Sequence, residues 1–160
     1  MKPKQVKILG LDPGFGRTGY AVLAGNKNSP SIKTFGCLQT STKLSQANRL
    51  KQLTSQLSEL LKKYQPTVVA IERVFFAANS KTALQVGEAR GALLVTIAKL
   101  VIPIVEYTPP QVKLAVTGDG RADKKQIQKM LQLLFKLRNP IKSDDAADAV
   151  AIAFCALTHL

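Results

Sequence analysis

The order of the apolar runs restricts the fold of this chain more than any other feature. Residues 6–11, 20–24 and 32–39 are short runs typical of β-strands, and turn-rich segments separate them at 12–19 and 25–31. They predict three antiparallel strands that follow one another as a meander. From residue 47 to residue 64, leucines recur at three- and four-residue spacing, which predicts an amphipathic helix that Pro66 ends.

The rest of the chain continues the alternation of strands and helices. Residues 67–72 form a Val- and Ile-rich run typical of a buried strand, and residues 103–107 predict a fifth strand. Helices are expected at 79–100, 110–116, 123–136 and 143–157. The order βββαβαβ followed by helices predicts an α/β fold, a mixed five-stranded sheet flanked by helices. With 160 residues, we expect a single domain spanning 1–160.

The net charge of the chain restricts the classes of partner that it is expected to bind. It carries 23 Lys and Arg against 10 Asp and Glu, a formal net charge of +13, which favours a nucleic acid or an acidic membrane surface. The most apolar region, residues 91–107, is interrupted by Lys99 and Pro103 and is too short for a membrane helix. No export signal is visible, so we expect a cytoplasmic protein, without a membrane partner, whose Cys37 and Cys155 are reduced.

Four of the ten acids lie in apolar surroundings. Asp12 ends the run KILGLD, Glu72 ends VVAIE, and Asp145 and Asp148 are three residues apart on one face of a predicted helix. Buried carboxylates need cations or hydrogen bonds. Clustered carboxylates suit Mg²⁺ or Mn²⁺, and two such ions about 3.5–4 Å apart promote phosphodiester hydrolysis.

Three of the four acids also have a simpler interpretation, and Asp148 does not. Asp12, in Asp-Pro-Gly, is typical of a turn, and Glu72 is able to pair with one of the many basic residues. Asp145 and its neighbour Asp144 follow Ser143 at a predicted helix start, where acids are favoured by the helix dipole. The four acids taken together, in a strongly basic chain, favour the metal site.

The segment from residue 113 to residue 142 is the most basic stretch. It has eight Lys and Arg against two Asp: Lys113, Arg121, Lys124, Lys125, Lys129, Lys136, Arg138 and Lys142. The loop at 118–120 precedes a basic helix, and both would bring backbone and lysines close to DNA phosphates. A solvated helix face is the alternative interpretation for any one lysine.

The second half of the predicted helix 79–100 is apolar nearly all round. This pattern indicates either a central position in the core or a helix shared with a partner chain. Small residues at 87, 89, 91 and 92 would permit close approach on one side.

Four segments resemble the successive motifs of the RuvC family of Holliday-junction resolvases, in the same order and at similar spacing. They are residues 8–22 (ILGLDPGFGRTGYAV), 69–91 (VAIERVFFAANSKTALQVGEARG), 107–128 (YTPPQVKLAVTGDGRADKKQIQ) and 144–153 (DDAADAVAIA). The resemblance implies a ribonuclease H-like fold and a homodimer that binds four-way junction DNA. It further implies paired symmetric nicks that leave 5′-phosphates, two Mg²⁺ per site with Mn²⁺ as a substitute, roles in recombination and repair, and RuvA and RuvB as partners.

Carried over by motif position, the resemblance makes Asp12, Glu72, Asp145 and Asp148 the metal-binding acids. The additional Asp144 shares a helix face with Asp148, so it remains a second candidate ligand. The other residues implied are two lysines near the scissile phosphate, an aromatic ring that stacks on a base, and further DNA-binding cations: Lys113, Lys124, Phe75, Lys81, Arg121 and Lys125.

Three other functions were weighed. The segment at 12–19 also resembles the glycine-rich phosphate loop of an actin-like or sugar-kinase ATPase, but those proteins use two such domains to enclose the nucleotide and this chain supplies one. A small YqgF-like nuclease shares the opening strand, although the segments around Glu72 and Lys113 match RuvC better. A non-catalytic protein that binds junctions, with structural acids, differs from a resolvase in lacking metal-dependent cleavage.

Overall fold

The computed structural model describes residues 6–14, 16–73 and 81–160. Its elements, in chain order, are β1 (Val6–Pro13), β2 (Arg17–Asn26), β3 (Ser29–Gln39), α1 (Gln46–Tyr64), β4 (Val68–Glu72), α2 (Ala83–Ala98), β5 (Ile104–Tyr107), α3 (Pro109–Thr117), α4 (Lys124–Leu134) and α5 (Asp144–His159). The sheet order is β3-β2-β1-β4-β5. The β1–β2 and β2–β3 pairs are antiparallel, and the β1–β4 and β4–β5 pairs are parallel. The predicted mixed five-stranded sheet is confirmed.

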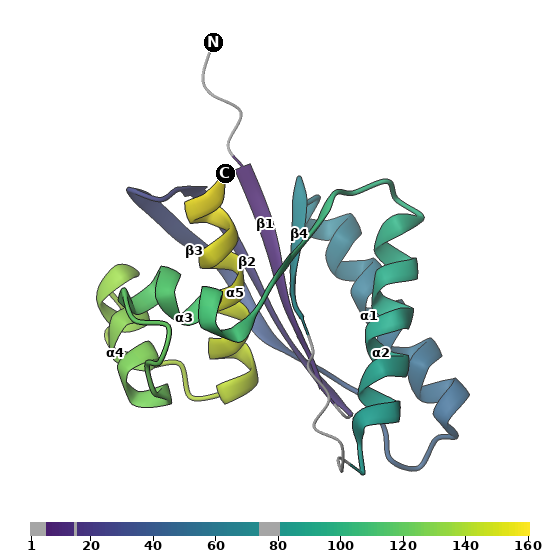
Figure 1. The fold of residues 1–160 in the computed structure, drawn as a ribbon. Helices are drawn as coiled ribbons and strands as arrows, with labels where there is room; N and C mark the ends of the chain where they lie inside the picture. Colours follow the sequence, from purple (N-terminus) through teal and green to yellow (C-terminus); the bar gives the residue numbers. More distant parts are fainter. Residues whose placement is uncertain (1–5, 15, 74–80) are drawn as a thin grey trace.

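Helices cover both faces of the sheet. In Figure 1, α1 and α2 lie on one face, and α3, α4 and α5 lie on the other. Successive residues of β1 alternate between two cores, because Ile8 packs on the α5 side and Leu9 on the side of α1 and α2. Between Ala146 and Leu157, every residue of α5 is buried except Asp148. The only partly exposed residue in this stretch is therefore one of the predicted metal ligands.

The segment at 12–19 differs from its prediction as a turn. The β1–β2 ladder continues through Asp12, which pairs with Gly19, to Pro13, which pairs with Thr18. The connection is thereby reduced to residues 14–16. Both Thr18 and Gly19 are buried, and the small glycine leaves space for α5 above the sheet. Packing against α5 thus extends strands through a sequence rich in turn-forming residues.

The helix α2 does not occupy a central core position. Its buried side chains form one stripe, Ala89, Leu93 and Ile97, whereas Leu84 and Val95 are 71% and 56% exposed. An added Cβ at Gly91 would meet no heavy atom within 4 Å. Of the two interpretations of this apolar helix, the structure therefore contradicts the central core position. In the described part of the chain, none of the helices has the length and apolar character needed to cross a membrane.

The contact between α5 and the sheet is unusually close at Gly10. A Cβ at this position would collide with the backbone oxygen of Ala149 and would lie 2.8 Å from the backbone nitrogen of Ala153. Because both neighbours are helix backbone, neither can move without displacing α5.

We predict that Gly10→Ala lowers the free energy of unfolding by about 1–3 kcal/mol, the usual cost of overpacking a core. The matched control is Gly120→Ala, where the added Cβ would have its nearest neighbour at 3.4 Å. Urea denaturation of the two variants measures the difference. Equal unfolding midpoints would contradict the close packing of α5.

Candidate active site

The candidate site begins at the ends of β1 and β4, which run parallel at the centre of the sheet. Leu11 pairs with Ile71, so the residues that follow, Asp12 and Glu72, lie at the carboxyl ends of neighbouring strands. Both carboxylates point to the α5 side, because side chains alternate along a strand and the preceding in-phase residues face that helix. The sheet thus places two of the predicted acids side by side.

The start of α5 brings the remaining acids to the same end. Ser143 caps the helix by accepting a hydrogen bond from the backbone nitrogen of Ala146, so Asp144 and Asp145 lie in its first turn. A Cβ at Gly19 would collide with the backbone oxygen of Asp145, which places this turn directly on β2. Asp148 follows one turn later.

Besides burial, the charges of neighbouring acids contribute to the raised pKa values of Asp12, Glu72 and Asp148. Burial raises the pKa of Asp12 to about 8, with further contributions from the charges of Asp148, Glu72 and Asp145. Burial also raises the pKa of Glu72 and, in that case too, the charge of Asp148 adds to the effect. The pKa of Asp148 is raised first by burial and then by the neighbouring charges of Asp144 and Asp145. Removing carboxylates from water and crowding them together disfavours their ionised forms.

Two predicted lysines oppose this accumulation of negative charge. Lys113 lowers the pKa of Glu72, and Lys124 lowers the pKa values of Asp12 and Asp148. A hollow of about 600 Å³ is lined by both lysines together with Glu72, Asp148, Pro109, Val112, Ile127 and Ala151. The lysines therefore line the same hollow as two of the acids.

Helix caps determine the positions of Lys113 and Lys124. A capping box between Thr108 and Gln111 starts α3, which carries Lys113 one turn later. A second capping box, between Asp123 and Gln126, makes Lys124 the first residue of α4. The Nζ atom of Lys124 lies 3.5 Å from Oδ2 of Asp144. Asp144 thus pairs with a lysine of the site, whereas Asp145 has other partners.

Asp145 has partners that the sequence did not predict. Its Oδ2 lies 3.1 Å from Nε of Arg17 and 3.9 Å from Sγ of Cys37. Cys37 also lies 3.1 Å from Oγ of Ser143. Arg17 lies two residues before Gly19, but this spacing indicates that the two residues share a face only once residues 17–19 are known to form a strand. Cys37 gave no signal.

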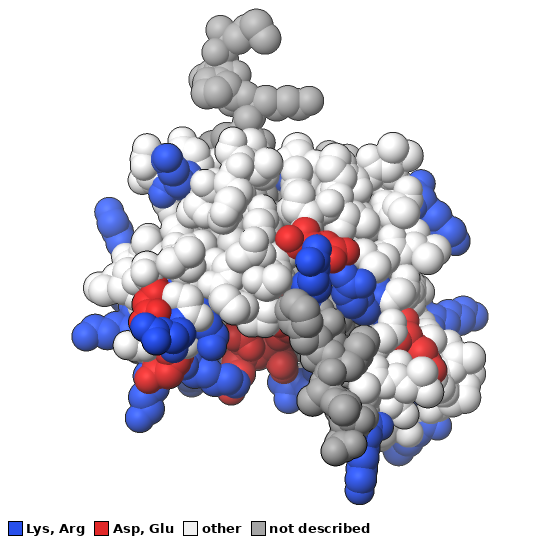
Figure 2. All heavy atoms as spheres, viewed as in Figure 1, with Lys and Arg blue, Asp and Glu red and all other residues white. Residues whose placement is uncertain are grey.

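The other predicted DNA-binding residues lie outside this cluster. Arg121 is exposed, and its Nε lies 4.0 Å from the carboxylate of Asp119 in the loop before α4. Lys81 and Lys125 are exposed. Phe75 lies outside the described residues. Figure 2 shows acidic side chains gathered at the lower edge of the molecule, near the end of the sheet where α5 starts in Figure 1, with basic side chains around them.

The site has the charge and the oxygen donors that a hard divalent cation requires. Burial first, and then the charges of Asp148, Glu72 and Asp145, raise the pKa of Asp12 to about 8, so its ionised form is disfavoured without added positive charge. Within residues 6–14, 16–73 and 81–160, no three Asp, Glu, His or Cys side chains are arranged to hold a metal ion. The suitability of this site for a divalent cation therefore rests on its carboxylate oxygens and its negative charge, and not on side chains already arranged around an ion.

A mixed sheet of this order, with acids at the ends of its central parallel strands, defines a ribonuclease H-like protein. The family model for crossover junction endodeoxyribonuclease RuvC matches residues 8–157. The curated RuvC of Petrotoga mobilis is 49% identical over 92% of this chain and 91% of its own length. That of Caldicellulosiruptor saccharolyticus is 47% identical over 94% and 91%.

Solved structures agree with these matches. Thermus thermophilus RuvC in complex with a Holliday junction substrate superposes with a TM-score of 0.90 at 29% identity, covering 96% of this chain and 94% of that one. The yeast mitochondrial Holliday junction resolvase Ydc2, at 18% identity and a TM-score of 0.68, covering 95% and 78%, shares the fold. The chain belongs to the RuvC family of crossover junction endodeoxyribonucleases. The family, the fold and the enzyme class expected from the sequence are confirmed.

We predict that Asp12→Asn stabilises the protein in EDTA and that the gain grows with pH. The pKa of Asp12 is about 8 in the folded protein against 3.8 ordinarily, so the folded chain binds this proton more tightly than the unfolded chain. The natural protein therefore loses stability as the pH rises from about 4 toward 8. The Asp12→Asn variant does not, because asparagine has no proton to release in this range. Melting temperatures from pH 4 to pH 9 measure this loss. Glu59→Gln, at an exposed acid of α1, is the control, and a constant difference for Asp12→Asn would contradict the prediction.

Proposed function

We propose that the protein resolves four-way DNA junctions in recombination and repair, by metal-dependent phosphodiester hydrolysis within a single nuclease domain spanning residues 1–160. The observation that carries this proposal is the gathering of Asp12, Glu72, Asp145 and Asp148 at one end of the sheet. Burial and then the charges of neighbouring acids raise the pKa values of Asp12, Glu72 and Asp148, in a chain of net charge +13. Similarity to a RuvC solved with junction DNA supports a junction as the substrate.

The four carboxylates are proposed as the ligands of two Mg²⁺ ions, with Mn²⁺ as a substitute. Bound ions would supply positive charge that activates the attacking water and stabilises the departing 3′ oxygen. Asp12 and Glu72 are fixed by strand ends, and Asp145 and Asp148 by the first turns of α5. Strands on one side and a helix on the other thus hold the acids in place.

Lys113 and Lys124 are proposed to stabilise negative charge on the scissile phosphate. Both line the hollow that also contains Glu72 and Asp148, so their ammonium groups lie where the phosphodiester would meet the acids. Lys81, Arg121 and Lys125 are exposed and are proposed to contact the DNA backbone outside this hollow. Stacking of Phe75 on an unpaired base stays a prediction from the family.

Two-fold symmetry supports a homodimer. A four-way junction is approximately two-fold symmetric, so paired nicks require two sites related by the same symmetry. We propose the exposed apolar side of α2, defined by Leu84, Gly91 and Val95, as the interface. A cytoplasmic location and the partners RuvA and RuvB remain predictions.

Cleavage of a labelled synthetic four-way junction tests the proposal. Paired symmetric nicks are expected with Mg²⁺ and none with EDTA, whereas matched linear duplex should stay intact. Asp12→Asn should abolish cleavage but keep junction binding, because it removes a charged metal ligand and leaves the basic surface unchanged. Glu59→Gln is the control, since this acid is exposed on α1.

Each other outcome has a separate meaning. Binding without nicks in both Mg²⁺ and Mn²⁺ would favour the architectural alternative. Nicking of every duplex would indicate a general nuclease. Unchanged nicking by Asp12→Asn would remove this residue from the mechanism.

We predict that Val95→Asp converts the dimer to monomers and suppresses paired nicks. A charge at a buried apolar interface costs more than the interface gains there. Leu133→Asp, on α4, is the matched control, because Leu133 is 62% exposed and Val95 is 56% exposed. Light scattering after size-exclusion chromatography gives the mass of each variant. A Val95→Asp dimer of normal stability would place the interface elsewhere.

A further inference from the structure

The carboxylate of Asp145 forms an ion pair with the guanidinium of Arg17. Nε of Arg17 lies 3.1 Å from Oδ2 of Asp145, and a terminal nitrogen of the same guanidinium lies 4.0 Å from Sγ of Cys37. Asp145 differs in this respect from Asp12, Glu72 and Asp148, whose opposing charges come from the lysines of α3 and α4. Arg17 thus contacts the acid cluster from the opposite side.

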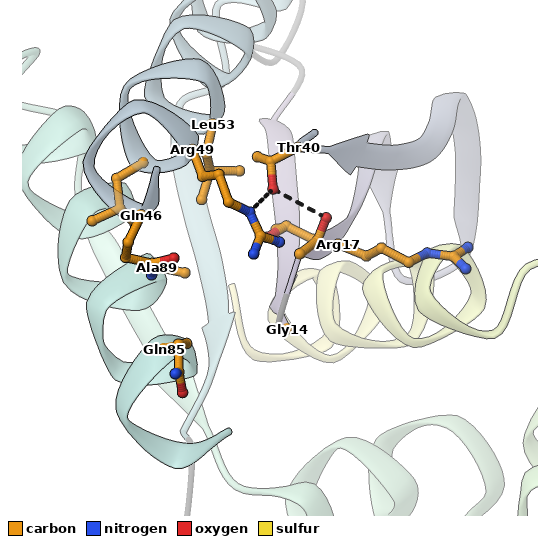
Figure 3. Close-up of a pocket in the computed structure, with 11 residues that line it drawn as sticks. Gly14, Arg17, Thr40, Gln46, Arg49, Leu53, Gln85 and Ala89 are labelled. Carbon is orange, nitrogen blue, oxygen red and sulfur yellow. Dashed lines mark hydrogen bonds between the residues drawn. The ribbon is translucent and has the colours of Figure 1, made fainter. Parts of the chain in front are cut away.

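The strand geometry determines this contact. Arg17 lies two residues before Gly19 on β2, so both residues face α5. The backbone of Asp145 rests on Gly19, which leaves the carboxylate within reach of the arginine. Figure 3 shows the Arg17 side chain extending toward α5, whereas Arg49 points to Thr40 on the other face of the sheet. The ion pair therefore follows from the close packing of α5 on β2.

The direction of the contact affects how Asp145 can serve as a ligand. The sheet order is β3-β2-β1-β4, and Asp145 Oδ2 contacts Arg17 of β2 and Cys37 of β3. Asp12 and Glu72 are on β1 and β4. The oxygen held by Arg17 is therefore directed to the side of the sheet away from these two acids. A cation shared between Asp12 and Asp145 would have to draw this oxygen away from the guanidinium or bind beside a positive charge.

We propose that Arg17 competes with a divalent cation for Asp145 and thereby weakens ion binding at the acid cluster. This inference rests on the proposed function, which makes Asp145 a metal ligand. The side chains of Arg17 and Asp145 are 56% and 36% exposed, so solvent screens their pairing and a dication can replace the guanidinium. The site then binds metal reversibly, with an affinity set in part by a residue that is not a ligand.

The alternative role for Arg17 is to orient Asp145 as a ligand, as outer hydrogen-bond partners of metal sites often do. The two roles have opposite consequences. A competing guanidinium lowers the affinity for the ion, and an orienting one raises it. The full charge of Arg17, its direct bond to the carboxylate oxygen and the direction of that bond favour competition.

Isothermal titration of the full chain with Mn²⁺, without DNA and at constant ionic strength, tests the inference. Arg17→Gln should bind Mn²⁺ roughly threefold more tightly than the natural protein, since an exposed ion pair contributes modestly. Arg17→Lys keeps the positive charge and should remain close to the natural affinity. Lys33→Gln, at an exposed lysine of β3, removes the same charge elsewhere and should leave the affinity unchanged.

Asp145→Asn separates failure of this inference from failure of the proposed function. It should weaken Mn²⁺ binding strongly if Asp145 is a ligand. If it does so, weaker or unchanged binding by Arg17→Gln would overturn competition, and weaker binding would identify Arg17 as an orienting residue. If Asp145→Asn binds Mn²⁺ as the natural protein does, or if no form binds it, the metal assignment of Asp145 fails and the competition fails with it.

Discussion

The backbone contact between α5 and the central strands determines the rest of the site. Gly10 and Gly19 have no side chain above the sheet, so the helix rests directly on the strands at two points. An aspartate side chain is short, and a helix held off by larger residues would leave Asp145 and Asp148 too far from the acid at the end of β1. Two glycines on the central strands therefore bring the acids of α5 into electrostatic contact with Asp12.

This arrangement works against the stability of the folded protein. Half of the ten acids of the chain, Asp12, Glu72, Asp144, Asp145 and Asp148, are gathered at one end of the sheet. Burial and neighbouring negative charge disfavour the ionised forms of Asp12, Glu72 and Asp148, and the surrounding elements place cations from α3, α4 and β2 beside the acids. The remainder of α5 is almost fully buried and anchors the helix in spite of the repulsion at its start.

Local sequence patterns predicted the helices and strands, whereas contacts between residues distant in sequence determined the features that these patterns did not predict. The periodicity of leucines predicted α1 to within a few residues, because a helix buries one stripe. The local turn signal at residues 12–19 was wrong, because the β1–β2 ladder continues through Asp12 to Pro13 where α5 packs on the next strand. Charge alone did not single out Lys113 and Lys124 among eight basic residues, and the family resemblance supplied them. Nothing local indicated that Arg17 would meet Asp145, a residue 128 positions away.

The distribution of charge also bears on the choice between a nuclease and a structural DNA-binding protein. A net charge of +13 attracts DNA to the molecule as a whole, but a phosphate that approaches the acid cluster is repelled. A protein that only bound junctions would gain nothing from placing half of its acids together beside Lys113 and Lys124, the two lysines proposed to contact the scissile phosphate. The repulsion disappears when cations lie between phosphate and carboxylate, which is the arrangement that hydrolysis requires. The cluster is therefore unfavourable for binding alone and favourable for metal-dependent cleavage.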